Sequence, residues 1–322
     1  MESSARPGAS SLPGALPPPG ASSLPDAEQL PDALLGLAVP FEDVEGLLAA
    51  RRRVARDHGL RAEFEETLSA QAAAVGTVGC ASGLWGGWPE GSDGTDYLSA
   101  LLFVALAPHT RAYHRSLGVP PEVTRATLAD LGRHLALSRR RGRSGGLRNP
   151  SWQTLHFRGE LFQLGRLQFQ RKRFTGPADE ASAAGPGAWF LELHVPGCCG
   201  PLSPGACDRS LALARAFFAR HFPAEPYRTA RIGSWLLDPQ LARYLPADSN
   251  IVRFQQRFTP LDPPGLPGRP GRPEDDDPLG FVFGDSRRPL AGLPRDTTLQ
   301  RALVDHLLAG GHWYVVGGWL RL

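Results

Sequence analysis

The chain has 322 residues, of which 42% are hydrophobic, so it is long enough for one large domain or two ordinary ones with buried cores. Its 35 basic and 32 acidic residues leave a formal net charge of only +3, which gives no whole-protein reason to expect nucleic acid or a membrane surface as a partner. Four cysteines are too few for a disulfide scaffold and lack zinc-finger spacing, so we expect no metal and a reducing, cytoplasmic location.

Residues 1–33 are predicted to form a disordered tail. Proline, glycine and serine dominate the segment, and Gly-Ala-Ser-Ser-Leu-Pro occurs at 8–13 and again at 20–25. Such a composition cannot bury enough apolar surface to offset the entropy of ordering. The segment lacks the apolar stretch of a signal peptide, and no hydrophobic run in the chain approaches the roughly 20 residues that a membrane-spanning helix needs.

Residues 34–147 show helical patterns and are predicted to form a helical N-terminal domain. Thr127, with Asp130 three residues on, is expected to cap its last helix. The arginine-rich segment 139–146 follows; because it has three glycines and no aromatic residue, we interpret it as a solvated linker, with a phosphate- or RNA-binding patch as the alternative. The expected helices run from Phe41 through Glu66, over Leu60–Ala74, from Asp96 to Pro108, from Pro120-Pro121 onward, and over Thr127–Ser138.

Residues 148–322 change to an extended pattern and are predicted to form a sheet-containing domain. One half-buried strand is expected over Leu161–Phe174, and a second over Trp189–Val195 pairs with it antiparallel. Further strands are expected at Tyr227–Leu237, Asn250–Phe258, Phe281–Phe283 and, as an edge strand, Trp313–Leu320, and helices at Ser210–Phe222 and Thr297–Leu308.

An anion-binding device is predicted in the middle of this domain. The strand at 188–195 leads into the turn Pro196–Pro201, which reads Pro-Gly-Cys-Cys-Gly-Pro, and then into a helix. Free backbone N–H groups and the positive end of the helix dipole meet at such a junction. The arrangement predicts that a phosphate-bearing ligand is possible near this turn.

The order of elements after residue 160 is similar to that of GNAT N-acetyltransferases, and longer stretches of sequence narrow the resemblance. They resemble a bacterial family of acyltransferase-domain proteins, in which a helical N-acyltransferase N-terminal domain precedes a GNAT-like C-terminal domain. The resemblance covers roughly residues 35–322. It is carried by the segment from Trp152 to Phe169, by Leu193-His-Val-Pro196, by Ser234-Trp-Leu-Leu-Asp-Pro-Gln-Leu241, and by the segment from Leu245 to Phe254.

The resemblance implies an α+β fold, with a helical N-terminal domain plus a GNAT-like mixed β-sheet domain with flanking helices. It also implies transfer of an acyl group from acyl-CoA or acetyl-CoA, as co-substrate, to an amine on a small molecule or peptide, by direct attack in a ternary complex. The alternative is a non-catalytic GNAT-like binding module for acyl-CoA or another small ligand.

Two departures from the family pattern favour that alternative. GNAT domains carry an arginine or glutamine followed by spaced glycines in the pyrophosphate loop, whereas the turn here offers only Gly197 and Gly200. In the family a Cys-His pair often precedes Ser-Trp-Leu-Leu, and Ile232 and Gly233 stand at those places. If that histidine were catalytic in the relatives, this chain would lack it.

Candidate catalytic residues follow from strand alternation and from the resemblance. Glu192 and His194 lie two apart on one strand and share a face, as candidates for the base that receives the amine proton, or else on the solvent side of the sheet. Tyr244 is the candidate acid for the leaving thiolate, with a packing role as the alternative, and Ser234 is a candidate for binding substrate or the thiolate. The resemblance places the donor against Leu193, Val195, Gly197, Cys198, Cys199 and Gly200, with backbone N–H groups on the strand holding the thioester carbonyl.

The paired cysteines also allow a covalent route. Cys198 or Cys199 near a helix N-terminus would be a nucleophile if its pKa were lowered there, with His194 close in sequence. Small residues in a tight turn need no such explanation, and this remains the minor hypothesis. Asp238, before Pro239, is expected to cap a short helix.

Overall fold

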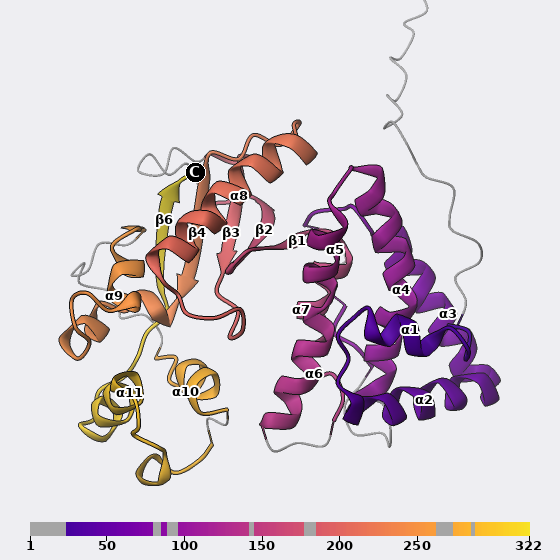
Figure 1. Cartoon of the computed structure of the whole chain (residues 1–322), viewed down its shortest axis with the longest axis horizontal. Coiled ribbons are helices and arrows are strands. Elements are labelled where there is room, and N and C mark those ends of the chain that lie inside the picture. Colours follow the sequence, from indigo (N-terminus) through magenta and orange to yellow (C-terminus); the bar gives the residue numbers. More distant parts are fainter. Residues whose placement is uncertain are drawn as a thin grey trace, which may run out of the picture.

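The structure is a computed structural model that describes residues 24–79, 85–88, 96–141, 145–176, 185–261, 273–284 and 287–322. Helices α1 to α7 gather on one side of the molecule, and a sheet with α8 to α11 forms the other side (Figure 1). Strand β1 lies where the two sides meet, and both α5 and α7 contact it. The α+β fold is as predicted.

The helical part is built around α4, which contacts α2, α3, α5 and α7. Residues 98–107 of α4 are all buried, so this helix is surrounded by its neighbours on every face. Asp57 separates α2 from α3 because its side chain accepts the backbone N–H groups of Gly59 and Leu60. The helices are α1 (Leu30–Leu35), α2 (Phe41–Arg56), α3 (His58–Ala73), α4 (Asp96–Ser116), α5 (Pro121–Leu128), α6 (Asp130–Arg140) and α7 (Pro150–Phe157).

In the part of the chain that the structure describes, the sheet has six strands in the order β1-β2-β3-β4-β6-β5. Only β3 and β4 run parallel among its neighbouring pairs, and the other neighbours are antiparallel. The predicted antiparallel pairing of the strand at Trp189 with the preceding one is confirmed. The strands are β1 (Leu161–Leu164), β2 (Leu167–Arg173), β3 (Trp189–His194), β4 (Thr229–Ser234), β5 (Thr259–Pro260) and β6 (Val316–Arg321).

One face of the sheet packs against α8 (Pro204–His221), which crosses β3 and β4 in Figure 1. Leu191 and Leu193 of β3 enter the core there, together with Phe217 and Phe218 of α8. Because neighbouring residues of a strand point to opposite faces, the polar residues that alternate with this core lie on the other face. The remaining helices are η1 (Trp235–Leu237), η2 (Pro239–Arg243), α9 (Asn250–Gln255), α10 (Asp276–Phe283), η3 (Leu290–Gly292) and α11 (Thr298–Leu308).

Several predicted strands are different in the structure. The long strand predicted at 161–174 is a hairpin, because Gly165, at a φ of +68°, turns the chain between β1 and β2. The strand predicted at 250–258 is wrong: Ser249 accepts the N–H of Val252 and starts helix α9. The strand predicted at 281–283 is also wrong, since those residues end α10 at the left-handed Gly284.

Three further predictions need correction. Thr127 does not cap a helix: it lies in α5, and its Oγ1 accepts the backbone N–H of Gln163 on β1. Strand β6 is not an edge strand, because the two-residue β5 covers part of its outer side. The predicted solvated linker begins later than expected, since Arg139 lies in α6 and its guanidinium is 2.6 Å from the buried carboxylate of Asp43.

The N-terminal tail was predicted to extend to residue 33. Helix α1 already begins at Leu30, and Leu30 and Leu34 are buried in the helical core, while residues 1–23 lie outside the described ones. Within the described residues, no helix combines the length and the hydrophobicity that crossing a membrane requires.

Candidate active site

Strand β3 brings two of the predicted catalytic residues to the sheet face that lies opposite α8. Glu192 and His194 alternate with the core residues Leu191 and Leu193, so they share that face as the alternation predicts. On β2 the residues directly across from them are Gln170 and Gln168. The face beside β3 is therefore polar.

His194 is held from two sides. Its Nε2 lies 3.1 Å from Oε1 of Gln170, and its ring meets the indole of Trp152 edge-on, with 4.9 Å between centroids and 84° between planes. Burial, with the charges of Lys172 and His156, lowers the pKa of His194 to about 3. The imidazole is therefore neutral near pH 7, which is the form that accepts a proton.

Glu192 is engaged in an ion pair. Its carboxylate lies 2.6 Å from the ammonium of Lys172, the only lysine in the sequence. The Lys172 side chain is 42% exposed, so this pair is partly solvated. The ammonium of Lys172 therefore shares the carboxylate of Glu192, whereas His194 has no ionic partner among the described residues.

A pocket of about 350 Å³ opens on the same face of the sheet, beside Glu192. Cationic and aromatic side chains meet there: the Arg231 guanidinium lies over the rings of Phe174, at 4.4 Å, and Phe190, at 5.3 Å. Gly233 and Gly317, which face each other across β4 and β6, form part of its wall. The pocket thus has a mixed polar and apolar lining.

Strands β3 and β4 separate beyond Glu192. The parallel register joins Leu191 with Ala230 and Glu192 with Arg231, yet β3 continues to His194 and β4 to Ser234. Within these two fully described strands, the register joins no further pair. The ends of β3 and β4 therefore lie apart from each other beside His194.

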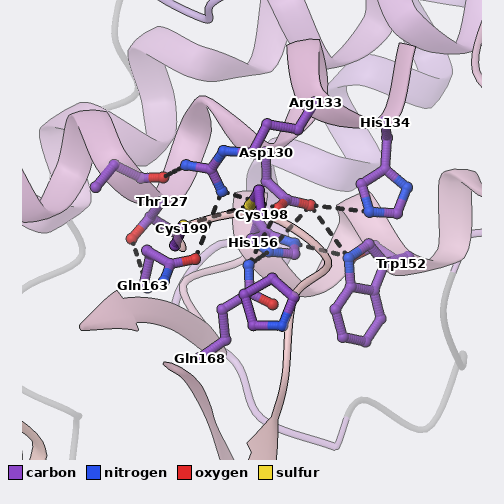
Figure 2. Close-up of polar contacts among 12 residues, drawn as sticks. Thr127, Asp130, Arg133, His134, Trp152, His156, Gln163, Gln168, Cys198 and Cys199 are labelled. Atoms are coloured by element: carbon purple, nitrogen blue, oxygen red, sulfur yellow. Dashed lines mark hydrogen bonds and ion pairs between the residues drawn. The ribbon is translucent and has the colours of Figure 1, made fainter. Parts of the chain in front are cut away.

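Asp130, at the start of α6, is the centre of a buried polar network between the helices and the sheet (Figure 2). Its Oδ1 accepts from Gln168 Nε2 and Arg133 Nη1, both at 3.1 Å. Its Oδ2 accepts from Nε1 of Trp152 and Nε2 of Gln153, again at 3.1 Å. Nε2 atoms of two histidines, His134 at 3.3 Å and His156 at 3.4 Å, complete its surroundings.

The network keeps Asp130 ionised. Burial by itself raises the pKa of this carboxyl group, but His156, His134, Arg133 and the Gln153 hydrogen bond together lower it to about 2. Burial lowers the pKa of both histidines as well. Asp130 is therefore charged, and it holds two residues beside His194 by hydrogen bonds. Trp152 packs against His194, and Gln168 lies opposite His194 in the register.

The other two predicted catalytic residues lie elsewhere. Ser234 ends β4, and its Oγ accepts the N–H of Leu236 to cap η1. Tyr244 follows η2, and its hydroxyl lies 2.9 Å from Nδ1 of His306 in a cluster with Trp313. Among the described residues, no contact joins Tyr244 to Glu192 or His194. Asp238 caps η2 as predicted, accepting the N–H of Gln240.

Arginines from outside the turn surround the predicted anion site. Helix α8 begins at Pro204 without a side-chain cap, which leaves the N–H groups of its first turn available. Arg166, in the β1–β2 turn, donates to the carbonyl of Pro196, and Arg257, after α9, donates to that of Pro204. A Cβ atom on Gly205 would lie 3.5 Å from Nη1 of Arg209. These arginines therefore lie near the turn at 196–201, which itself contains no cationic residue.

The geometry of the turn does not favour a cysteine nucleophile. The sulfurs of Cys198 and Cys199 lie 3.3 Å apart, and Cys199 and Gly200 adopt left-handed backbone conformations, with φ of 72° and 81°. Burial, together with the Cys199 contact, raises the pKa of Cys198 to about 11. The covalent alternative required a lowered pKa, so this direction opposes it.

Sequence reasoning missed most of the residues around His194. Trp152 and His156 are four apart on α7 and therefore share one helical face, and Gln168 and Gln170 alternate with apolar residues on β2. Both spacings could have been recognised in the sequence. The burial of Asp130 could not, because it depends on how α6 and the sheet pack together.

In the part of the chain that the structure describes, no group of three or more His, Cys, Asp or Glu side chains is arranged to hold a metal ion.

The chain is similar to known protein families and to solved structures. Residues 28–159 match the N-acyltransferase N-terminal domain, and residues 161–320 match the GNAT-like C-terminal domain. No curated protein sequence gives a significant match.

Several solved structures are similar over almost the whole chain. A mutant acyltransferase in complex with octanoyl-CoA is 38% identical, with a TM-score of 0.83 over 95% of this chain and 91% of that one. An acyltransferase in complex with CoA and 10C-teicoplanin is 37% identical, with a TM-score of 0.83 and the same coverage of 95% and 91%. One with decanoyl-CoA and teicoplanin is 37% identical, with a TM-score of 0.80 and coverage of 95% and 91%. The chain belongs to this family of acyltransferases, in which an N-acyltransferase N-terminal domain is joined to a GNAT-like C-terminal domain.

Proposed function

We propose that this protein transfers an acyl group from acyl-CoA to an amine by direct attack, with His194 as the base. The observation that carries the proposal is the separation of β3 from β4 immediately beside His194. A pantetheine arm fits between separating strands, and the backbone N–H groups of Leu193 to Val195 then face the thioester carbonyl. The neutral imidazole of His194 stands on the same stretch of strand.

The donor's phosphates would bind at the N-terminal end of α8. Free N–H groups, the helix dipole and the guanidinium groups of Arg166 and Arg209 supply the positive potential there, whereas the charge of Arg257 is paired with Asp208. The turn residues Gly197, Cys198, Cys199 and Gly200 would contact the donor with their backbone. In this arrangement, cations from neighbouring elements would replace the arginine that the pyrophosphate loop of this chain lacks.

The acceptor would approach from the sheet face opposite α8, where His194, Glu192 and the 350 Å³ pocket lie. The solved relatives include complexes with teicoplanin, a glycopeptide, and with octanoyl- and decanoyl-CoA. We therefore propose an amine on a glycopeptide-like molecule as acceptor and a medium-length acyl chain on the donor. A cytoplasmic location remains a prediction.

In the reaction, the acceptor nitrogen attacks the thioester carbon and one N–H proton passes to His194. The C–N bond forms as the C–S bond breaks, and the products are an amide and CoA, which takes up a proton at sulfur. The Ser234 hydroxyl, at the end of β4, is a candidate to stabilise the thiolate, since its oxygen accepts the N–H of Leu236 in the cap and, among the described residues, no hydrogen bond uses its proton.

Calorimetric titration with octanoyl-CoA, acetyl-CoA and free CoA tests the donor site. We expect micromolar binding that Gly197→Asp weakens, because the new carboxylate would repel the phosphates. Gly292→Asp is the matched control, since no atom lies within 4 Å of its added Cβ and it belongs to η3 and not to the turn. If the protein bound none of the three ligands, the result would contradict the proposal.

A further inference from the structure

Cys198 and Cys199 place two thiol groups in contact within the turn between β3 and α8. Their sulfurs lie 3.3 Å apart, within hydrogen-bonding distance for sulfur (Figure 2). In an extended chain the side chains of consecutive residues point to opposite sides, but here they lie on the same side. Cys199 has a φ of 72°, in the left-handed region that few residues other than glycine adopt. The turn thus combines an unusual backbone conformation with a pair of adjoining thiols.

The two thiols differ in their access to solvent. Cys199 is exposed, whereas Cys198 is half-buried. Burial, together with the contact to Cys199, raises the pKa of Cys198 to about 11, so this thiol keeps its proton near pH 7. Cys199 is therefore the sulfur that a reagent in solution meets first, and Cys198 is the neighbouring sulfur that reacts second.

We propose that Cys198 and Cys199 are a modification site, at which a low-molecular-weight disulfide oxidises the pair to a vicinal disulfide and thereby weakens binding of the acyl-CoA donor. The oxidation itself concerns only the two thiols. The effect on the donor rests on the function proposed above, in which the backbone of this turn contacts the donor.

The oxidation proceeds by two successive thiol–disulfide exchanges. The thiolate of Cys199 attacks one sulfur of the reagent, and the other half of the reagent leaves as a thiolate and takes up a proton. Cys198 then loses its proton, and its sulfur attacks Sγ of Cys199, which breaks the bond between Cys199 and the reagent. The cysteine pair gives up two electrons and the reagent gains them. The products are one bond between Cys198 and Cys199 and two molecules of the free thiol.

A bridge between adjacent residues must change the shape of the turn. Consecutive Cα atoms are about 3.8 Å apart, whereas disulfides usually join Cα atoms that are roughly 4.4 to 6.8 Å apart. Closing the bridge also brings the two sulfurs from 3.3 Å to roughly 2 Å. The backbone N–H groups of the turn then leave the positions in which they would face the donor. Because such a bridge is strained, free thiols reduce it readily, and the modification is reversible.

Mass spectrometry of the intact protein after treatment with oxidised glutathione tests the oxidation. We expect a product that has lost two hydrogen atoms and that dithiothreitol converts back. Cys198→Ser and Cys199→Ser should each abolish this product. Cys207→Ser is the matched control, because Cys207 is buried in α8, and it should form the product as the native protein does. A lasting glutathione adduct without a bridge, a bridge that survives Cys199→Ser, or a bridge between two molecules would overturn the proposal.

Calorimetric titration with octanoyl-CoA tests the effect on the donor. We expect a Kd on the order of 10-fold higher for the bridged protein than for the reduced protein, which corresponds to the loss of about one hydrogen bond to the phosphates. The Kd of Cys199→Ser should not respond to oxidised glutathione. An unchanged Kd in the fully bridged protein would overturn the effect on the donor. Bridge formation in a protein that binds no acyl-CoA when reduced would support the oxidation and contradict the proposed function.

Discussion

The side-chain amide of Gln168, on β2, donates to Oδ1 of Asp130, on α6, over 3.1 Å. Gln168 is the residue directly across from His194 in the sheet register, so the hydrogen bond joins the helical part to the strand beside the proposed base. Trp152 makes the second connection, since its indole N–H donates to Asp130 and its ring packs against His194. The helical part thus contributes directly to the surroundings of the proposed active site.

Asp130→Asn should destabilise the protein by roughly 3 kcal/mol, because removing one partner of a buried ionic network leaves the other polar groups unsatisfied. Urea denaturation measures the change. Asp208→Asn is the matched control: its pair with Arg257 spans 2.6 Å but the Asp208 side chain is 63% exposed, so a much smaller loss is expected. Equal losses in the two variants would show that Asp130 has no special structural role.

Gly233→Leu should raise the acceptor KM about tenfold or more while leaving the fold intact. The Cβ atom added there has its nearest neighbour, Val315, at an ordinary contact distance of 3.7 Å, and the longer side chain would project into the 350 Å³ pocket. Steady-state kinetics with varied acceptor at saturating acyl-CoA measures the effect, and circular dichroism checks the fold. Unchanged acceptor kinetics would place the acceptor elsewhere.

Tyr244→Phe should change kcat by less than about threefold. Nε2 of His306 lies 3.1 Å from the carbonyl of His312 and must donate to it, so Nδ1 of His306 accepts the Tyr244 proton. That proton is therefore already used within the η2–α11 cluster. A loss of kcat by on the order of 100-fold, with the acyl-CoA KM unaffected, would instead restore Tyr244 as the general acid.

Stability should fall as pH decreases from about 6.5, the ordinary pKa of histidine. Burial, aided by the charge of Arg171, lowers the pKa of His114 to about 4, so the unfolded chain binds a proton in this window that the folded protein does not. His194 adds to the same trend. Thermal unfolding between pH 7 and pH 4.5 checks this, and His114→Asn should make the dependence on pH shallower. A slope unaffected by His114→Asn would exclude this cause.

The sequence was most informative where a local rule decides the structure. The capping of α11 by Thr297 and of η2 by Asp238 depends on neighbours along the chain, and both helices were predicted. The shared face of Glu192 and His194 follows from strand alternation alone.

The local sequence pattern led to a wrong prediction where capping and tertiary packing favour a different secondary structure. Residues 250–258 alternate like a strand, but the Ser249 cap and burial of Val252 and Phe254 favour the helix α9. The environment of His194 could not be predicted, because Trp152 comes from α7 and Gln170 from β2. Only tertiary packing brings these two side chains to His194.

The most direct test of the proposed reaction is the rate of CoA release from octanoyl-CoA in the presence of a glycopeptide amine, compared between the native protein and His194→Ala. We expect acceptor-dependent CoA release by the native protein and a kcat at least about 100-fold lower in the variant, because general-base catalysis is typically worth 10²- to 10⁴-fold. Calorimetry should show octanoyl-CoA bound equally by both proteins. Equal rates of CoA release would contradict the assignment of His194 as the base.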